Sequence, residues 1–455
     1  MRHIMLPLML CVVAACQTPS ASRYAIVGAT LVDGTGAAPV EDAVVVVGDG
    51  RILCAGPRAD CTVPGDAETI DAAGAWLTPG LIDAHVHFSQ TGWYDGRPDA
   101  VDFRDQYPYP EVIADLEAHP ERFFDAYLCS GVTSVFDVGG YPWTWSLRRR
   151  FQDDHRAPRI AAAGPLLSTV DFWLNLPGQQ QFIYMADDET VRRAVQSHAA
   201  FETDAVKIWY IMPPQPPDTA RVQRLVRAAA DEATAQGLQL IVHATGLWEA
   251  KDAIRAGADL LVHSVWSEPV DDEFIDLARE SGVVYTPTLT VLEGYEHAAR
   301  GTVDGSLYPL ECADQRSRAL VASPPAADRL PQNRLTPESA RATQRRTEIG
   351  QQNAKRLHDA GVAITVGTDA GNPGTLHGPS IYREMELLQQ AGLAPMDVLV
   401  AATKIGARAM GREQELGTVE EGKLADLVLL DADPTEDIAN ARRVRWVMKG
   451  GVPRE

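Results

Sequence analysis

The chain has 455 residues, of which 45% are hydrophobic and 23% are charged. This composition is typical of a folded globular protein that is long enough for one large domain and a small one. The formal net charge is -21 at pH 7, and no Lys/Arg-rich run offsets it. Such a surface repels nucleic-acid phosphates and anionic lipids, so nucleic acid is excluded as an expected partner.

The N-terminal segment predicts export. The stretch MRHIMLPLMLCVVAAC has one arginine, an apolar run too short to span a membrane, and small residues before Cys16. Residues 13–16, VAAC, resemble a bacterial lipobox, in which the cysteine becomes the lipidated first residue of the mature protein. We therefore expect residues 1–15 to be a lipoprotein signal peptide. Cys16 would then anchor the protein to a membrane, facing the periplasm or the cell surface. A plain signal peptide that is cleaved nearby is the alternative.

Four cysteines follow this segment, in an export context where disulfides can persist. They are Cys54, Cys61, Cys129 and Cys312. Cys54 and Cys61 are close enough in sequence to pair, but spacing alone does not decide whether they do.

Two β-rich segments lie far apart in the chain. Residues 23–77 alternate short Val/Ile runs with Gly and Asp-Gly turns, and residues 415–455 repeat this texture. We predict that the two segments close one small β-sandwich around the chain termini.

Between these segments, residues 78–414 alternate short apolar strands with amphipathic helices, a pattern typical of a parallel sheet. Eight strands are predicted, at residues 81–88, 132–138, 159–165, 205–211, 238–244, 258–264, 283–289 and 362–370. Eight such units predict an α/β fold, a (β/α)8 TIM barrel. The longest insertion, residues 292–335, is expected to form a lid or a wall of the pocket.

Polar side chains recur near the C-terminal ends of these strands, where barrel enzymes place their active sites. Two histidines spaced by two residues project from the same side of a strand, so both can reach one cation. A lone pair of this kind is weak evidence, because buried histidines are often only hydrogen-bonded core residues. Here four histidines and an aspartate share this position, which predicts a metal site. These residues are His85, His87, His243, His263 and Asp369.

Lys207 is a sixth polar residue, at the centre of the predicted strand 205–211. A lysine among apolar neighbours is costly to bury as a cation, so it pairs with an acid, deprotonates or reaches water. The residues alone leave these alternatives open.

The chain resembles the amidohydrolase superfamily at several motifs. They are LTPGLIDAHVHF at residues 77–88, AVKIW at 205–209, the later His243 and His263, GTDAG at 367–371 and GTVEEGKLADLVLLDADP at 417–434. Within that superfamily it looks like the imidazolonepropionase-like or prolidase-like branch of metal-dependent hydrolases. The resemblance implies two divalent metal ions, usually zinc, in a (β/α)8 barrel flanked by a β-sandwich.

The resemblance also implies roles for the six residues. His85, His87 and Asp369 would bind the more buried metal, and His243 and His263 the more exposed one. Lys207, carboxylated by carbon dioxide, would bridge both ions. A water molecule between the metals would lose a proton to become the attacking hydroxide. Asp369 would accept that proton and deliver it to the leaving nitrogen. The alternatives are an ion pair with a barrel acid for Lys207 and a ligand role alone for Asp369.

The expected reaction is hydrolysis of an amide bond in a small molecule, a dipeptide such as Xaa-Pro or an N-acyl amino acid. One-metal deaminases and true imidazolonepropionases of the superfamily tend to carry a glutamate three residues after the strand-five histidine, where this chain has Gly246. Hydrolysis of a cyclic amide, lactone or ester is the alternative reaction, and a surface-anchored binding protein is the non-enzymatic alternative. A homo-oligomer is compatible with this interpretation. The predicted substrate contacts are Tyr141, Tyr210 and His377.

Overall fold

The structure is a computed structural model that describes residues 23–171, 181–212, 218–322, 325, 329–330 and 336–454. The predicted signal peptide and the predicted lipidation site Cys16 lie outside these residues. Within the described ranges, no helix is both long enough and apolar enough to cross a membrane.

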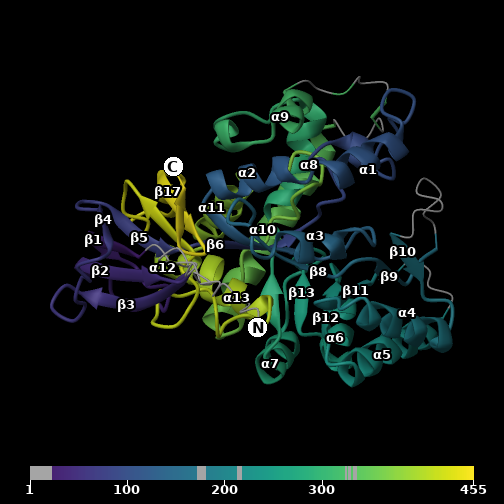
Figure 1. The fold of residues 1–455 in the computed structure, drawn as a ribbon. Helices are drawn as coiled ribbons and strands as arrows, with labels where there is room; N and C mark the ends of the chain where they lie inside the picture. The colour runs from purple at the N-terminus through teal and green to yellow at the C-terminus, as the bar shows by residue number, and fades with distance from the viewer. Residues whose placement is uncertain are drawn as a thin grey trace, which may run out of the picture.

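An eight-stranded sheet joins the two ends of the described chain. Its strands follow the order β18-β17-β16-β5-β1-β2-β3, and β4 pairs with β1. Figure 1 shows the purple N-terminal strands beside the yellow C-terminal ones. Five strands come from the N-terminal segment: β1 (Tyr24–Leu31), β2 (Val40–Gly48), β3 (Arg51–Pro57), β4 (Glu68–Asp71) and β5 (Trp76–Pro79). Three come from the C-terminal segment: β16 (Leu427–Leu430), β17 (Val444–Lys449) and β18 (Val452–Arg454).

The join between the two segments is the antiparallel pairing of β16 with β5, in which Leu427 lies opposite Pro79. Buried side chains from both segments, among them Ile26, Val45 and Met448, share one apolar cluster. The association of the two β-rich segments is therefore observed. Hydrogen bonds link all eight strands into one sheet, so a two-layer sandwich stays a prediction.

All eight predicted parallel strands are present, in two parallel sheets. The first contains β6 (Leu81–Val86), β7 (Val132–Asp137) and β8 (Arg159–Ala162). The second has the order β10-β9-β11-β12-β13-β14-β15. Its members are β9 (Leu166–Ser168), β10 (Phe182–Tyr184), β11 (Ala205–Trp209), β12 (Gln239–His243), β13 (Leu260–Val262), β14 (Val284–Thr286) and β15 (Ala363–Ile364). β9 and β10 were not predicted, and β15 is much shorter than the predicted strand 362–370.

Backbone hydrogen bonds connect the two parallel sheets. The segment after β15 runs along β6, because the Ala84 N–H donates to the Val366 carbonyl over 3.0 Å and the Asp369 N–H donates to the His85 carbonyl over 2.7 Å. Near the other edge, the Asp204 N–H donates to the Ala162 carbonyl of β8 over 3.1 Å. The parallel α/β arrangement fits a TIM-barrel-like fold.

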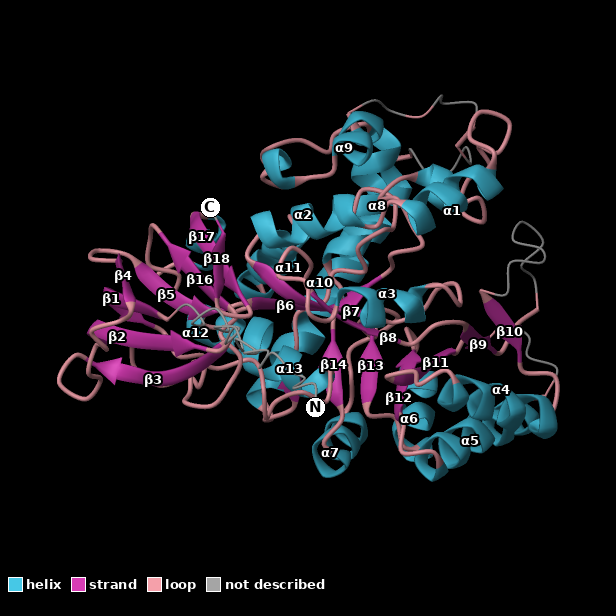
Figure 2. Cartoon of the chain, in the orientation of Figure 1, coloured by secondary structure: helices cyan, strands magenta, loops and turns pink. Residues whose placement is uncertain are grey.

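Helices alternate with these strands and lie outside β11 to β14 (Figure 2). Asp187, Asp218 and Asp271 cap three of them by accepting a hydrogen bond from a backbone N–H of the first turn. The helices are α3 (Thr144–Phe151), α4 (Asp188–Ala200), α5 (Thr219–Ala235), α6 (Leu247–Ala256), α7 (Asp272–Ser281), α10 (Pro337–Asp359), α11 (Ser380–Gln390), α12 (Pro395–Val400) and α13 (Gly406–Ala409), with a π-helical segment η3 (Ala401–Ile405) and a 3-10 turn η4 (Ile438–Arg442).

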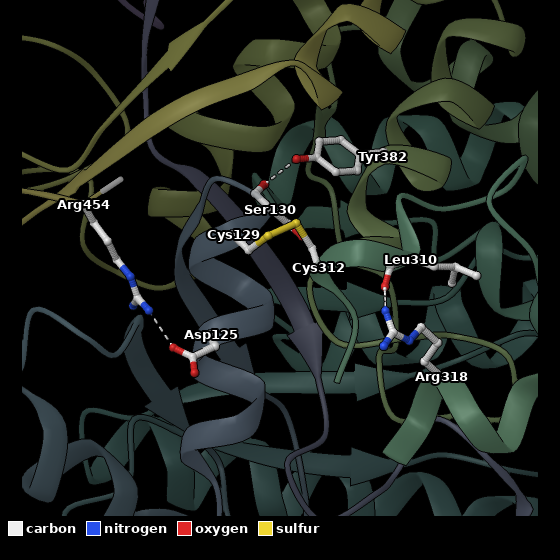
Figure 3. The surroundings of a disulfide bond; sticks show 8 residues. All are labelled: Asp125, Cys129, Ser130, Leu310, Cys312, Arg318, Tyr382 and Arg454. Carbon is white, nitrogen blue, oxygen red and sulfur yellow. Dashed lines mark hydrogen bonds and ion pairs between the residues drawn. A yellow bond between two sulfur atoms is a disulfide. The ribbon is translucent and has the colours of Figure 1, made fainter. Parts of the chain in front are cut away.

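Insertions after β6 and β14 pack against each other on one side of the parallel sheets. They contain η1 (Tyr94–Gly96), α1 (Tyr109–Ala118), α2 (Glu121–Cys129), α8 (Thr290–Arg300), η2 (Leu310–Cys312) and α9 (Gln315–Val321). Trp93 and Phe103 of the first insertion share a buried cluster with Val303 and Tyr308 of the second. A disulfide between Cys129 and Cys312 joins the end of α2 to η2 (Figure 3). The pairing of Cys54 with Cys61, which the sequence left open, is also present.

Candidate active site

One cavity brings together all six residues that the sequence predicted as metal ligands. The cavity lies at the C-terminal ends of the parallel strands, and each of the six residues lines it. We call this group the strand-end cluster; it consists of His85, His87, Lys207, His243, His263 and Asp369.

The orientation of His87 is set by a hydrogen bond away from the cluster. Its Nδ1 lies 2.6 Å from the Gly139 carbonyl oxygen, and a carbonyl can only accept, so Nδ1 carries the proton. In a neutral ring, Nε2 then holds a lone pair. This atom lies 3.0 Å from Oδ1 of Asp369. A lone pair facing a carboxylate oxygen is stable only with a proton or a metal cation beside it.

His85 and Asp369 supply further atoms without hydrogen-bond partners. Nδ1 and Nε2 of His85 and Oδ1 of Asp369 are buried and accept or donate no hydrogen bond among the described residues. Nε2 of His85 lies 3.2 Å from the same carboxylate oxygen that His87 approaches. Buried polar atoms are normally paired, so this convergence fits a cation bound between the two imidazoles and the carboxylate.

His263 lies between the two expected halves of the cluster. Its ring centroid is 4.4 Å from that of His243 and 4.9 Å from that of His85. His263, His85 and Asp369 offer ligand atoms within 4.8 Å of one another. His263 therefore also lies near the ligand atoms expected at the other metal, and its grouping with His243 stays a prediction. Its Nδ1 lies 2.7 Å from Oγ1 of Thr288, which leaves Nε2 for a ligand.

Burial keeps these imidazoles neutral. It lowers the pKa of His85 and His243 well below the usual range, and the positive charge of Lys207 lowers both further. Burial, followed by charge on His243 and Lys207, lowers the pKa of His263 in the same direction. Neutral imidazole is the form that binds a metal ion.

Lys207 is 1% exposed. Burial lowers the pKa of its ammonium group to about 7, and the charge of Asp369 offsets this only in part. Within the described ranges, no carboxylate forms an ion pair with Lys207. Asp369 thus acts on Lys207 through its charge without a close ion pair, and a neutral amine is accessible near pH 7.

The backbone around the cluster is strained at three positions other than glycine. Thr288, His263 and Asp369 have φ angles of 48°, 73° and 61°, each of which costs of order 1–3 kcal/mol. Asp83 holds the segment before Asp369 by accepting hydrogen bonds from the Thr368 hydroxyl over 2.7 Å and its N–H over 3.0 Å. Strained positions held by such bonds are typical of functional sites.

Asp137 of β7 supports the loop that begins at Phe88. Its carboxylate accepts hydrogen bonds from the N–H groups of Phe88 over 2.9 Å and Gly139 over 3.1 Å. The second of these residues is the one whose carbonyl orients His87. Burial raises the pKa of Asp137 to about 6.

A second polar group lines the cavity, and the sequence did not predict it. Asp99 accepts two hydrogen bonds from the Arg97 guanidinium, over 2.9 Å from Nε and 2.7 Å from Nη2. Nη1 of Arg97 donates to Oδ1 of Asn372, which also accepts the Tyr295 hydroxyl over 2.8 Å. We call this group the arginine network; its members are Arg97, Asp99, Tyr295 and Asn372, and all line the cavity. The available signal was an Arg-x-Asp triplet that begins nine residues after the end of the first predicted strand, residues 81–88.

The three predicted substrate contacts do not line the cavity. The Tyr210 hydroxyl donates to Asp252 over 2.8 Å, and the Tyr141 hydroxyl donates to Tyr109 over 2.8 Å. His377 is buried, with Nδ1 2.7 Å from the Tyr127 hydroxyl and Nε2 3.0 Å from the Gln90 carbonyl oxygen.

The strand period explains the placement of Tyr210. Successive side chains of a strand point to opposite faces, so Lys207 and Trp209 share the cavity face of β11 and the following Tyr210 points away. Trp209 lines the cavity together with other large apolar side chains: Leu166, Phe182, Trp266, Val291 and Leu292. The last two begin the insertion after β14, so the predicted wall in that region is present in part. A direct substrate role for Tyr141, Tyr210 and His377 stays a prediction that this cavity does not support.

A parallel α/β fold with neutral imidazoles and a carboxylate gathered at its strand ends defines the class of metal-dependent hydrolases. Residues 76–453 match the family model described as the amidohydrolase family, so the chain belongs to that family. It is a metal-dependent hydrolase that acts on C–N bonds, of the branch that contains imidazolonepropionase-like and prolidase-like proteins.

Two relatives illustrate the branch. The chain is 28% identical over 424 residues to an imidazolonepropionase of Methylobacterium nodulans, covering 87% of this chain and 88% of that protein. Its structure matches that of a Xaa-Pro dipeptidase with bound methionine in the active site, with a TM-score of 0.73 and 26% identity, over 95% of this chain and 100% of the other. A molinate hydrolase, at 24% identity and a TM-score of 0.71 over 96% of this chain and 95% of that chain, shares the fold.

Proposed function

We propose that this protein is an exported two-metal hydrolase that cleaves the amide bond of a dipeptide, such as Xaa-Pro, or of an N-acyl amino acid. One observation carries the proposal: the strand-end cluster lines a single cavity, where buried ligand atoms of His85 and Asp369 have no hydrogen-bond partner among the described residues. A binding protein would have no need of a strained aspartate and a buried neutral lysine at the same point.

The cluster offers donors for two divalent ions, which we propose are zinc. His85, His87 and Asp369 would hold one ion and His243 and His263 the other, with Lys207 as a carboxylated bridging ligand. A neutral amine is the form that reacts with carbon dioxide, and the resulting carbamate has two anionic oxygens. When bound, the two ions lower the pKa of a water molecule and polarise the substrate carbonyl.

The remaining steps fall to the side chains. Asp369 accepts the proton of the attacking water and delivers it to the leaving nitrogen as the C–N bond breaks. Thr288 holds the His263 ring, and the Gly139 carbonyl holds the His87 ring, so neither ligand must reorient during turnover. Trp209, Trp266 and Leu292 provide an apolar wall for the acyl group or side chain.

Peptide-like cleavage is favoured over imidazolone ring opening by two features. Gly246 stands where one-metal relatives carry a glutamate, and Lys207 supplies the bridging position that a two-metal site needs. The structural similarity to a Xaa-Pro dipeptidase supports the same choice.

The proposal includes the finer architecture and location. We propose a closed (β/α)8 barrel over residues 78–414, with residues 23–77 and 415–455 as a β-sandwich domain. The protein would be a lipoprotein anchored through Cys16 after removal of residues 1–15, facing the periplasm or the cell surface.

Metal analysis combined with a substrate screen tests the function. The purified protein, reconstituted with Zn²⁺, is assayed against dipeptides, N-acyl amino acids, lactones and esters. We expect turnover of amide substrates that is lost after chelation and restored by metal. If only lactones or esters are turned over, the substrate class is one of these and not an amide. Bound metal without turnover of any compound would favour a binding protein.

A further inference from the structure

Arg97 is the one cation lining the described part of the cavity that does not belong to the strand-end cluster. Its side chain is 23% exposed and that of its partner Asp99 is 20% exposed. Taking such a pair out of water carries a desolvation cost that mutual attraction alone offsets poorly. Asp99 occupies one edge of the guanidinium, and the N–H groups that it leaves on the cavity wall can bind a further ligand of opposite charge.

Asp99 and Asn372 fix the orientation of the Arg97 guanidinium and leave some of its N–H groups without a partner among the described residues. It has five N–H groups, and three of them are used: Nε and one on Nη2 by Asp99, and one on Nη1 by Asn372. One N–H on each Nη atom has no partner among the described residues. Two N–H groups on one planar fork match the two oxygens of a carboxylate.

The fork is also fixed relative to the reaction centre. Nδ2 of Asn372 donates to the main-chain carbonyl of Asp369 over 3.1 Å. The side chain of Asn372 therefore connects the Arg97 guanidinium to the backbone of Asp369, the proposed proton carrier. The charge of Arg97 also acts on His243 and His263. An anionic group of a substrate bound at the strand-end cluster would lie within reach of this fork.

We infer that Arg97 binds the free carboxylate of the amino acid that leaves when the amide bond is cleaved. The enzyme would then select dipeptides and N-acyl amino acids with a free carboxylate over the same compounds capped as carboxamides. This assignment rests on the proposed amide hydrolysis and specifies its substrate class. Tyr295 and Asn372 would act as positioning residues for the fork.

Two matched substrate pairs test the assignment with the metal-loaded enzyme: leucyl-proline against leucyl-prolinamide, and N-acetyl-leucine against its carboxamide. The expected kcat/KM of the wild type is about 100-fold higher for the free acid of the pair that it cleaves, because the capped compound lacks the second carboxylate oxygen that the two remaining N–H groups of Arg97 would bind. In Arg97→Gln this preference should fall to within about 3-fold, mainly through a raised KM for the acid. Arg97→Lys should retain an intermediate preference, because it keeps the charge but loses the fork.

The chain contains a matched control. Arg104 forms the same two-bond contact with an aspartate two residues away, Asp102, but at an exposed position of the same insertion. Arg104→Gln should leave the preference for the free acid intact.

Each other outcome is decisive. Equal turnover of acid and amide by the wild type would overturn the assignment and leave the proposed function standing. Arg97→Gln and Arg97→Lys could both lose metal, or both lower kcat/KM equally for the free acid and the carboxamide. In that case Arg97 supports the metal centre and does not bind the substrate carboxylate. If the loaded wild type cleaves neither member of either pair, the proposed function fails and the assignment fails with it.

Discussion

The two polar groups that line the cavity are built in different ways. The strand-end cluster comes from six residues in or just after five parallel strands, and the pairing of these strands sets where each side chain lies. The arginine network comes from two insertions and the segment after β15, which hydrogen bonds and the Cys129–Cys312 disulfide hold together. Chemistry that the family shares is thus placed on the rigid frame, and the group we assign to substrate selection is placed on loops.

The largest effect should come from Asp369→Asn, which separates metal binding from proton transfer. The amide keeps an oxygen that can bind a cation, but it cannot accept the proton. We expect kcat to fall by about 10³-fold while at least half of the bound metal is retained. Metal content and kcat are measured on the same sample. A parallel loss of metal and activity would mean that Asp369 acts as a ligand only.

Opening the Cys129–Cys312 disulfide should loosen the insertions without disturbing the strand-end cluster. Its residues are 183 positions apart, and removing a native disulfide typically costs about 2–5 kcal/mol of unfolding free energy. We expect the Cys129→Ser/Cys312→Ser double variant to lose stability in this range, to raise KM and to keep its metal.

The matched control for that variant is Cys54→Ser/Cys61→Ser, which opens a disulfide with a separation of 7. The shorter loop should make its stability loss smaller, and its KM should stay near the wild-type value. Loss of metal from the Cys129→Ser/Cys312→Ser variant would show that the two regions are not separable.

Thr288→Val tests the support of His263. The substitution removes the hydroxyl next to Nδ1 and keeps the branched side chain at this strained position. Loss of such a support typically lowers metal affinity or activity by about 10- to 100-fold. The control is Thr286→Val, because the Thr286 hydroxyl is buried and has no hydrogen-bond partner among the described residues. Equal effects of the two substitutions would argue against a role for the bond to His263.

Glu384 should give the smallest effect, a pH dependence of stability. Its carboxyl group accepts hydrogen bonds from the N–H groups of Leu289 and Thr290, and burial raises its pKa to about 8. The native state therefore holds a proton that the unfolded chain releases near pH 4.5. This contribution to stability is full below pH 4.5 and is lost as the pH rises through about 8.

The measurement is urea unfolding of the wild type and Glu384→Gln at several pH values. One extra proton contributes a slope of up to about 1.4 kcal/mol per pH unit, and Glu384→Gln should remove it. An unchanged slope in the variant would show that Glu384 is ionised in the native state.

The sequence predicted the strands and the strand-end cluster because both depend on local patterns. Apolar runs mark each strand, and the position of His85, His243 or Asp369 in its run fixes the edge of the sheet at which it lies. The arginine network depends on contacts between Arg97 and Asn372, 275 residues apart, and no local pattern encodes these. Tyr210 follows Lys207 by three residues, so the alternation of strand faces turns it away from the cavity face that Lys207 and Trp209 share, although it is close to Lys207 in sequence. The Cys129–Cys312 disulfide also joins residues far apart in the chain, so no local pattern predicts it.

The central claim is that Lys207 bridges two metal ions, and metal analysis of Lys207→Ala tests it most directly. Wild type and variant are reconstituted with Zn²⁺ in bicarbonate buffer, and bound metal is counted beside turnover. We expect about two ions per chain in the wild type and one or fewer in the variant, because the anion that offsets their mutual repulsion is lost. Added acetate or formate should restore part of the activity by taking the place of the carbamate. A folded variant that keeps two ions and near-normal turnover would contradict the claim.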